Sequence, residues 1–127
     1  MKSILITVVC VVLALSMLSL AQTGKPNSYT RLMEYEGFVP NSATDLVAKT
    51  VQLQTIQLTN ESAADVTCII TAKTSGRSIY GSATAPGYLA SGSTMVMQLN
   101  DRTVEGGLRW HCSAASAVNA YVAWKEQ

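Results

Sequence analysis

Residues 50–59 read TVQLQTIQLT, a run in which polar and apolar side chains alternate. Successive side chains of a β-strand point to opposite faces, so this alternation predicts a strand with one buried face. The phase of the alternation shifts between Leu53 and Ile56. A β-bulge near Gln54 and Thr55 would return both apolar sets to the same face, and we expect one there.

The same period of two recurs along the rest of the chain, in residues 66–72, 94–99, 108–113 and 118–124. Each of these runs predicts a strand with an inward apolar face. The inward sets are Val66, Cys68 and Ile70; Met95, Met97 and Leu99; Leu108, Trp110 and Cys112; and Val118, Ala120, Val122 and Trp124. Shorter strands are expected at 31–36, ended by Gly37 and Pro40, and at 78–83.

Clusters of Gly, Ser, Asn, Asp and Pro separate these strands and predict turns. The expected turns are residues 41–45, 60–65, 74–77, 100–102, 105–107 and 114–116. After Lys49 no stretch shows a helical period with caps. The sequence therefore predicts an all-β fold: a single antiparallel β-sandwich, jelly-roll or immunoglobulin-like, over residues 31–127, preceded by a linker at 22–30.

The first 21 residues form a separate segment, because residues 4–21 are apolar and Lys2 is the only charge ahead of Lys25. We expect a hydrophobic helix there, either a signal peptide cut after Ala21 or a retained membrane anchor. Both alternatives place residues 22–127 outside the cytoplasm. The expected location is secreted, periplasmic or extracellular, with attachment to the membrane through residues 4–21 if they are retained.

Three cysteines are present, and Cys10 lies in the apolar segment. Cys68 and Cys112 both fall on inward faces, so we predict a disulfide between them across the core, with Trp110 packed nearby. Two buried free thiols are the alternative. We predict no metal site and no cofactor, because the only imidazole, His111, adjoins Cys112 and points to the opposite face of its strand.

Charge and motifs argue against catalysis and against nucleic-acid binding. The chain has nine Lys and Arg against eight Asp and Glu, and Lys2 precedes the apolar segment, so the remainder is neutral and has no basic cluster. His111 is the single histidine, and the sequence has no nucleophile motif that would pair with it as a catalytic base. We expect His111 to face solvent on a strand. Glu34 and Glu36 share a strand face, as the paired carboxylates of a glycosidase could, but their segment is peripheral and we expect a solvated face. Asp101 and Glu105 flank turns, where Asp commonly caps the backbone. The prediction is a protein that is not an enzyme.

Binding is better supported than catalysis. Tyr80, Tyr88 and Tyr121 fall on loops or outward faces, where aromatic rings can stack on carbohydrate or fill a partner's pocket, and ordinary cross-strand packing is the alternative. Asn60 begins a glycosylation sequon, Asn60-Glu61-Ser62. Unpaired strand edges can also take a partner strand, and the polar leader at 22–36 is long enough to be such a donated strand.

Residues 55–67, TIQLTNESAADVT, resemble a hairpin of small β-sandwich modules in phage virions and bacterial surface proteins. The segments at 105–107, 113–115 and 118–122 are similar to the closing strands of those modules. The resemblance spans residues 49–125 and implies a structural or attachment role without catalysis.

These observations predict an exported structural or attachment module at the cell surface or envelope, one that self-assembles, into a filament or larger complex, or binds a protein partner. The first alternative is a small carbohydrate- or ligand-binding β-sandwich domain that uses Tyr80, Tyr88 and Tyr121. The second alternative is a single-span accessory subunit of a membrane complex or of a membrane-containing virion.

Overall fold

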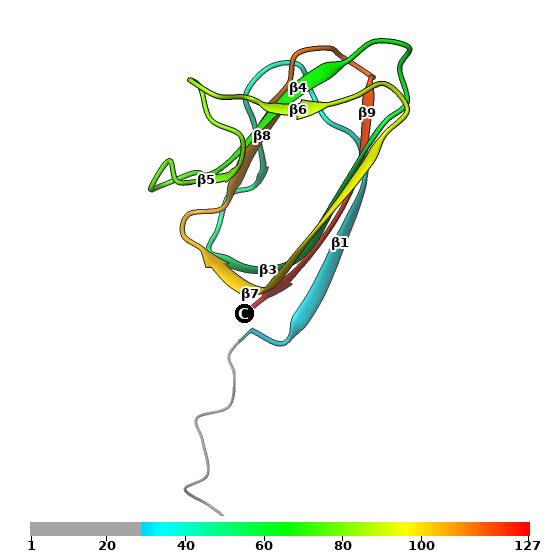
Figure 1. The fold of residues 1–127 in the computed structure, drawn as a ribbon. Helices are drawn as coiled ribbons and strands as arrows, with labels where there is room; N and C mark the ends of the chain where they lie inside the picture. Colours follow the sequence, from blue (N-terminus) through cyan, green and yellow to red (C-terminus); the bar gives the residue numbers. More distant parts are fainter. Residues whose placement is uncertain (1–28) are drawn as a thin grey trace, which may run out of the picture.

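The computed structural model describes residues 29–127, which form two stacked antiparallel sheets (Figure 1). The hydrophobic helix expected at 1–21 and most of the linker at 22–30 lie outside the described residues. Within the described range the strands are β1 (Arg31–Phe38), β2 (Thr44–Val47), β3 (Val51–Asn60), β4 (Val66–Ala72), β5 (Ser78–Tyr80), β6 (Gly87–Leu89), β7 (Thr94–Val104), β8 (Leu108–Cys112) and β9 (Val118–Glu126).

One sheet has four strands in the order β1-β9-β3-β7, and the other has the order β2-β8-β4-β5, with β6 also paired to β4. The antiparallel pairs β1–β9, β2–β8, β3–β7 and β4–β5 follow one another along one long two-stranded ribbon. When the ribbon folds, consecutive pairs of strands come to lie in opposite sheets. This strand order is that of a jelly roll and differs from an immunoglobulin sandwich, whose first two strands are neighbours in one sheet.

The predicted inward faces form the core between the sheets. On β3, Leu53, Ile56 and Leu58 are completely buried, as the alternation predicts. The sets on β4, β8 and β9 are buried as well, whereas the methionines of β7 are only partly covered. The register of β3 shifts between Leu53 and Thr55 against both of its neighbours, which confirms the predicted bulge.

The turn predicted at 100–102 is wrong, because these residues lie inside β7. Asn100 and Asp101 have positive φ angles of 47° and 65° and form an irregularity opposite the bulge of β3. Short polar side chains tolerate this left-handed conformation. Asp101 accepts hydrogen bonds from Gln54 and Lys125, so the turn-like residues serve to hold three strands together at the bulge.

Two other segments differ from the prediction. The turn expected at 41–45 ends early, because Thr44 and Asp45 already belong to β2 and pair with β8. The carboxylate of Asp45 forms ion pairs with Lys73 Nζ at 2.7 Å and with Arg109 Nε at 2.8 Å, and these contacts hold the edge strand β2 in place. The strand expected at 78–83 is shorter, since β5 ends at Tyr80, and β6 has too few residues to show an alternating pattern.

The predicted disulfide between Cys68 and Cys112 is present, and both residues are buried. The expectation that this disulfide crosses the core between the two sheets is wrong. The two residues lie directly opposite each other on β4 and β8, neighbouring strands of one sheet, with Cα atoms 4.0 Å apart. Directly opposed residues of adjacent strands point to the same face, so two inward cysteines bond without reaching the other sheet.

The idea that residues 22–36 form a donated strand is wrong for their second half. Residues 31–36 belong to β1, which pairs with β9 of the same chain from Arg31 opposite Glu126 to Phe38 opposite Asn119. Beyond β1 the four-stranded sheet has no further strand among residues 29–127, so this edge is open in the described part of the chain.

Candidate functional site

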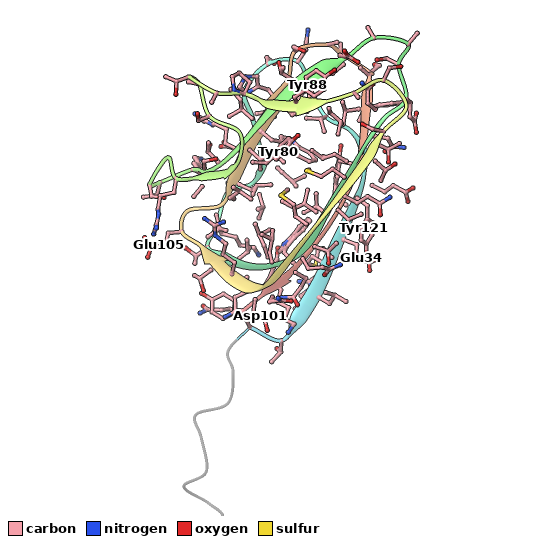
Figure 2. The ribbon with its side chains drawn as sticks, in the orientation of Figure 1. Glu34, Tyr80, Tyr88, Asp101, Glu105 and Tyr121 are labelled. Atoms are coloured by element: carbon pink, nitrogen blue, oxygen red, sulfur yellow. A yellow bond between two sulfur atoms is a disulfide. The ribbon has the colours of Figure 1, made fainter. Side chains whose placement is uncertain are left out.

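The three tyrosines singled out in the sequence do not form one site. Tyr80 and Tyr88 belong to the five-stranded sheet, and Tyr121 belongs to β9 of the other sheet (Figure 2). The hydroxyl of Tyr80 donates a hydrogen bond of 2.7 Å to the Tyr88 carbonyl, and its ring covers Gly87, where a Cβ atom would come within 2.3 Å. Tyr80 is half-buried against the core, and this burial raises its pKa.

Tyr88 is the most exposed of the three, with 60% of its surface accessible. Its hydroxyl donates a 2.5 Å hydrogen bond to Asp65, whose other carboxylate oxygen accepts the Ser91 amide at 2.9 Å. The bond from Tyr88 lowers the pKa of Asp65 and raises the pKa of Tyr88 itself. The exposed ring is therefore held in one position by its hydroxyl end.

Tyr121 lies on the outward face of the four-stranded sheet, as its place in the alternation predicts. In the register it stands between Glu36 of β1 and Gln57 of β3. Its hydroxyl donates a hydrogen bond of 2.8 Å to Glu34, and this contact with a carboxylate raises the pKa of Tyr121. Glu34 and Glu36 do share an exposed strand face, as expected.

The outward side chains of β1, β9, β3 and β7 form a surface that we name the outer sheet face. Most of its interior positions carry uncharged Thr, Gln and Asn side chains. Exposed apolar side chains stand toward its borders: Leu32 (56% accessible) and Phe38 (46%) on β1, and Val96 (52%) on β7. Of the exposed large hydrophobic residues in the described chain, Tyr88 alone lies elsewhere.

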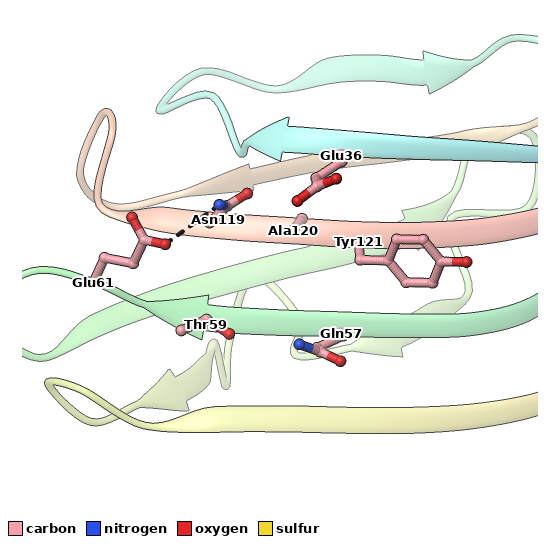
Figure 3. Close-up of a pocket in the computed structure, with 7 residues that line it drawn as sticks. All are labelled: Glu36, Gln57, Thr59, Glu61, Asn119, Ala120 and Tyr121. Carbon is pink, nitrogen blue, oxygen red and sulfur yellow. Dashed lines mark hydrogen bonds between the residues drawn. The ribbon is translucent and has the colours of Figure 1, made fainter.

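A pocket of about 220 Å³ opens on the outer sheet face, near the start of β9 (Figure 3). Asn119 donates a 3.3 Å hydrogen bond through Nδ2 to Glu61, while its Oδ1 is buried and has no partner among the described residues. The residues that line the pocket are Glu36, Gln57, Thr59, Glu61, Asn119, Ala120 and Tyr121.

The chemistry of this pocket is that of a hydrogen-bond acceptor. Two carboxylates and an unpaired amide oxygen are present, and no lysine or arginine lines the cavity. Guanidinium, ammonium and hydroxyl groups are the donors that such a lining binds. Among residues 29–127 no three or more His, Cys, Asp and Glu side chains gather in an arrangement that could hold a metal ion.

A second pocket, of about 180 Å³, lies where the β4–β5 turn meets the end of β7. Arg77, Arg102 and Glu105 supply its charged groups. Arg102 donates a hydrogen bond of 3.3 Å to the Ser78 carbonyl, and the guanidinium of Arg77 has no hydrogen-bond or ion-pair partner among the described residues. His111 belongs to neither pocket and is half-buried on the outward face of β8.

Asn60, the first residue of the predicted sequon, is completely buried. Its Nδ2 donates to the carbonyls of Ala64 at 2.8 Å and Leu89 at 3.0 Å, and its Oδ1 accepts from the amide and hydroxyl of Ser62. A glycan on Nδ2 would break at least one buried hydrogen bond and would have no room, so we expect folded chains to carry none at Asn60.

The pocket residues Gln57, Thr59, Glu61 and Asn119 were not predicted as a site. Their alternation with apolar neighbours marks Gln57, Thr59 and Asn119 as outward, and this was the only local signal. The pocket exists because β9 inserts between β1 and β3, which brings together segments far apart in the sequence. A local pattern carries no information about that pairing.

No protein-family model matches the chain, and no curated protein is detectably similar to it. Similar solved structures include the tobacco streak virus coat protein dimer, with 9% identity, a TM-score of 0.40, and coverage of 83% of this chain and 90% of that chain. Another is the Drosophila melanogaster CENP-C cupin domain, with 12% identity, a TM-score of 0.31, and coverage of 83% and 65%. Likeness at this level assigns neither a family nor a function.

In the part of the chain from residue 29 onward, no helix has the length and apolar character needed to cross a bilayer.

Proposed function

We propose that this chain is an exported structural module without catalytic activity, which assembles with further copies of itself through the outer sheet face. The observation that carries the proposal is the composition of that face. Exposed Leu32, Phe38 and Val96 stand around an interior rich in uncharged polar side chains.

Such a face suits contact with protein. Protein interfaces are depleted of charged groups at their centre. On the two central strands of this face, β9 and β3, Lys125 is the one charged outward side chain, and it is already paired with Asp101 at 2.9 Å. The open edge of β1 adds unpaired backbone groups beside the same face.

Export is supported by the apolar segment at 4–21 and by the Cys68–Cys112 disulfide. Disulfides persist in oxidising compartments and are rare in the cytosol. An exported protein of this size also benefits from a covalent link, because a small core stabilises a domain only modestly.

Self-assembly is tested on the full chain, produced in a host that exports it and purified under non-reducing conditions. Light scattering after size exclusion over a wide concentration range, together with negative-stain electron microscopy, gives the mass and shape of the particles. We expect mass to rise with concentration, and Val96→Lys to reduce it, since the lysine must be desolvated at the interface. A monomer at every concentration would refute the proposal.

A carbohydrate-binding role is the second candidate, and the pocket beside Tyr121 favours it. An aromatic ring next to carboxylate and amide acceptors matches the needs of a sugar, which has apolar faces and many hydroxyl donors. A glycan array with the wild type and Tyr121→Ala tests this candidate. Binding that disappears in the variant supports it, and an array without hits removes it.

A further inference from the structure

Most positively charged side chains in the described chain already have partners. Lys49 contacts Glu126, Lys73 and Arg109 contact Asp45, and Lys125 contacts Asp101. Arg102 donates to a carbonyl. Among residues 29–127, only Arg31 and Arg77 have guanidinium groups without a hydrogen bond or close ion pair, and Arg31 is electrostatically coupled to Glu126.

Arg77 is presented by a well-defined turn between β4 and β5. The Ala72 amide donates to the Arg77 carbonyl at 2.9 Å, and the Gly76 amide donates to the Ala72 carbonyl at 2.9 Å. Gly76 has a φ of +65° with open space around it, so the turn is exposed at its tip. The backbone that carries Arg77 is fixed, while its charged end is free.

The pocket on the outer sheet face, by contrast, has acceptor oxygens that lack hydrogen-bond donors. Within residues 29–127, the carboxylate of Glu36 makes no hydrogen bond or close ion pair, the carboxylate of Glu61 accepts a hydrogen bond only from Asn119 Nδ2, and Asn119 Oδ1 has no donor. A guanidinium group offers five N–H donors in a planar fork and accepts none, which complements a cluster of carboxylate and amide oxygens.

The two features cannot meet within one molecule. Glu105, whose carbonyl accepts the amide of Thr74 in the β4–β5 turn, lies on the opposite side of the sandwich from Tyr121 in the pocket (Figure 2). A contact between a projection on one side and a recess on the other joins unlike surfaces of two copies. Repetition of such a contact produces rings or open filaments rather than closed dimers.

We propose that the β4–β5 turn of one copy docks onto the outer sheet face of the next, with Arg77 entering the pocket between Glu36 and Glu61. This inference rests on the proposed self-assembly and names its interface. If a basic group of a different protein or a sugar occupies the pocket instead, Arg77→Glu leaves self-association unchanged.

The test uses single charge reversals in the full exported chain, with association measured by sedimentation velocity and light scattering. Arg77→Glu removes the donor, and Glu36→Arg places a positive charge in the pocket. We expect each variant alone to associate at least about 10-fold more weakly than the wild type, because like charges then face each other at the contact. Arg31→Glu is the control, with the same charge change on an exposed arginine that belongs neither to the β4–β5 turn nor to the pocket lining.

Mixing gives the decisive readout. In an equimolar mixture of Arg77→Glu and Glu36→Arg chains, each turn meets a pocket of opposite charge, so we expect assembly to return. The double variant, Arg77→Glu with Glu36→Arg, restores assembly for the same reason. Thermal unfolding of every variant under non-reducing conditions establishes that the fold is intact.

The outcomes separate the two proposals. If the wild type is monomeric, the proposed function fails and this interface fails with it. If the wild type assembles but Arg77→Glu and Glu36→Arg leave assembly unchanged, self-assembly stands and this interface is wrong. Weakening by both reversals without rescue in the mixture or the double variant also refutes a direct contact between the two sites.

Discussion

The ammonium group of Lys49 lies 2.6 Å from the carboxylate of Glu126, the last residue of β9. Glu126 is buried, although it is charged and stands near the end of the chain. Its other carboxylate oxygen accepts a hydrogen bond of 3.0 Å from the indole nitrogen of Trp124. The end of β9 is thus pinned to the segment before β3 by a charge and a hydrogen bond.

We predict that acid weakens this fold partly through Glu126. The hydrogen bond from Lys49 lowers its pKa from the ordinary 4.5, helped by the bond from Trp124. A carboxyl with a lowered folded-state pKa stabilises the fold above its unfolded pKa, and this stabilisation is lost as pH falls through the folded pKa. Urea midpoints should therefore drop between neutral pH and about pH 3. In Glu126→Gln the drop should be smaller, and an identical drop would contradict the assignment.

Alkaline pH should weaken the fold through the tyrosines. Burial raises the pKa of Tyr80, and hydrogen bonds to Asp65 and Glu34 raise those of Tyr88 and Tyr121 above the ordinary 10.0. A raised folded-state pKa gives stabilisation that is complete below pH 10.0 and is lost as pH rises through the folded value. Absorbance titration of the phenolates beside circular dichroism checks this, and half-ionisation of the three phenols at pH 10.0 with the fold intact would refute it.

Removal of the disulfide should cost substantial stability. The bridge spans 44 positions, and in the chain-entropy model a loop of that length contributes about 3–4 kcal/mol. We expect the double variant Cys68→Ala with Cys112→Ala to lose roughly this amount in the free energy of unfolding by urea, plus a small cavity term. A loss below about 1 kcal/mol would show that the bridge does not constrain the unfolded chain in this way.

Asn60 should be among the most sensitive polar positions. Asn60→Ala leaves the carbonyls of Ala64 and Leu89 without their side-chain donor, and each buried unpaired group costs about 1–3 kcal/mol. We expect a total loss of about 3 kcal/mol in urea unfolding. Ser62→Ala, which removes a partly exposed hydroxyl from the same network, is the control and should cost about 1 kcal/mol.

Two glycines should respond very differently to alanine. At Gly107, with a φ of +105°, a Cβ atom would lie 1.9 Å from the Val47 carbonyl oxygen, so we expect Gly107→Ala to cost more than about 3 kcal/mol or to prevent folding. At Gly76 the space is open and only the positive φ opposes the change, so Gly76→Ala should cost about 1–2 kcal/mol. Thermal melts of both variants decide this, and equal losses would contradict the steric account.

Local pattern was sufficient for the long strands and their buried faces, but not for the short strands β2 and β6. The alternation of residues 50–59 predicted both β3 and its bulge, because the side-chain period of a strand is fixed by backbone geometry. The same reasoning failed at Asn100 and Asp101, whose turn-forming character is used within a strand, where the bulge of β3 requires a partner irregularity.

For residues 31–127 the sequence by itself determined an all-β fold with one polar and one apolar side to each long strand, and it marked Cys68 and Cys112 as inward. Only the tertiary structure decided that these cysteines are neighbours in one sheet, that Asn60 and Glu126 are buried, and which outward side chains share a pocket. The physical reason is that side-chain alternation is a property of each strand alone. Strand order depends on how a long ribbon folds to cover all of its apolar faces at once.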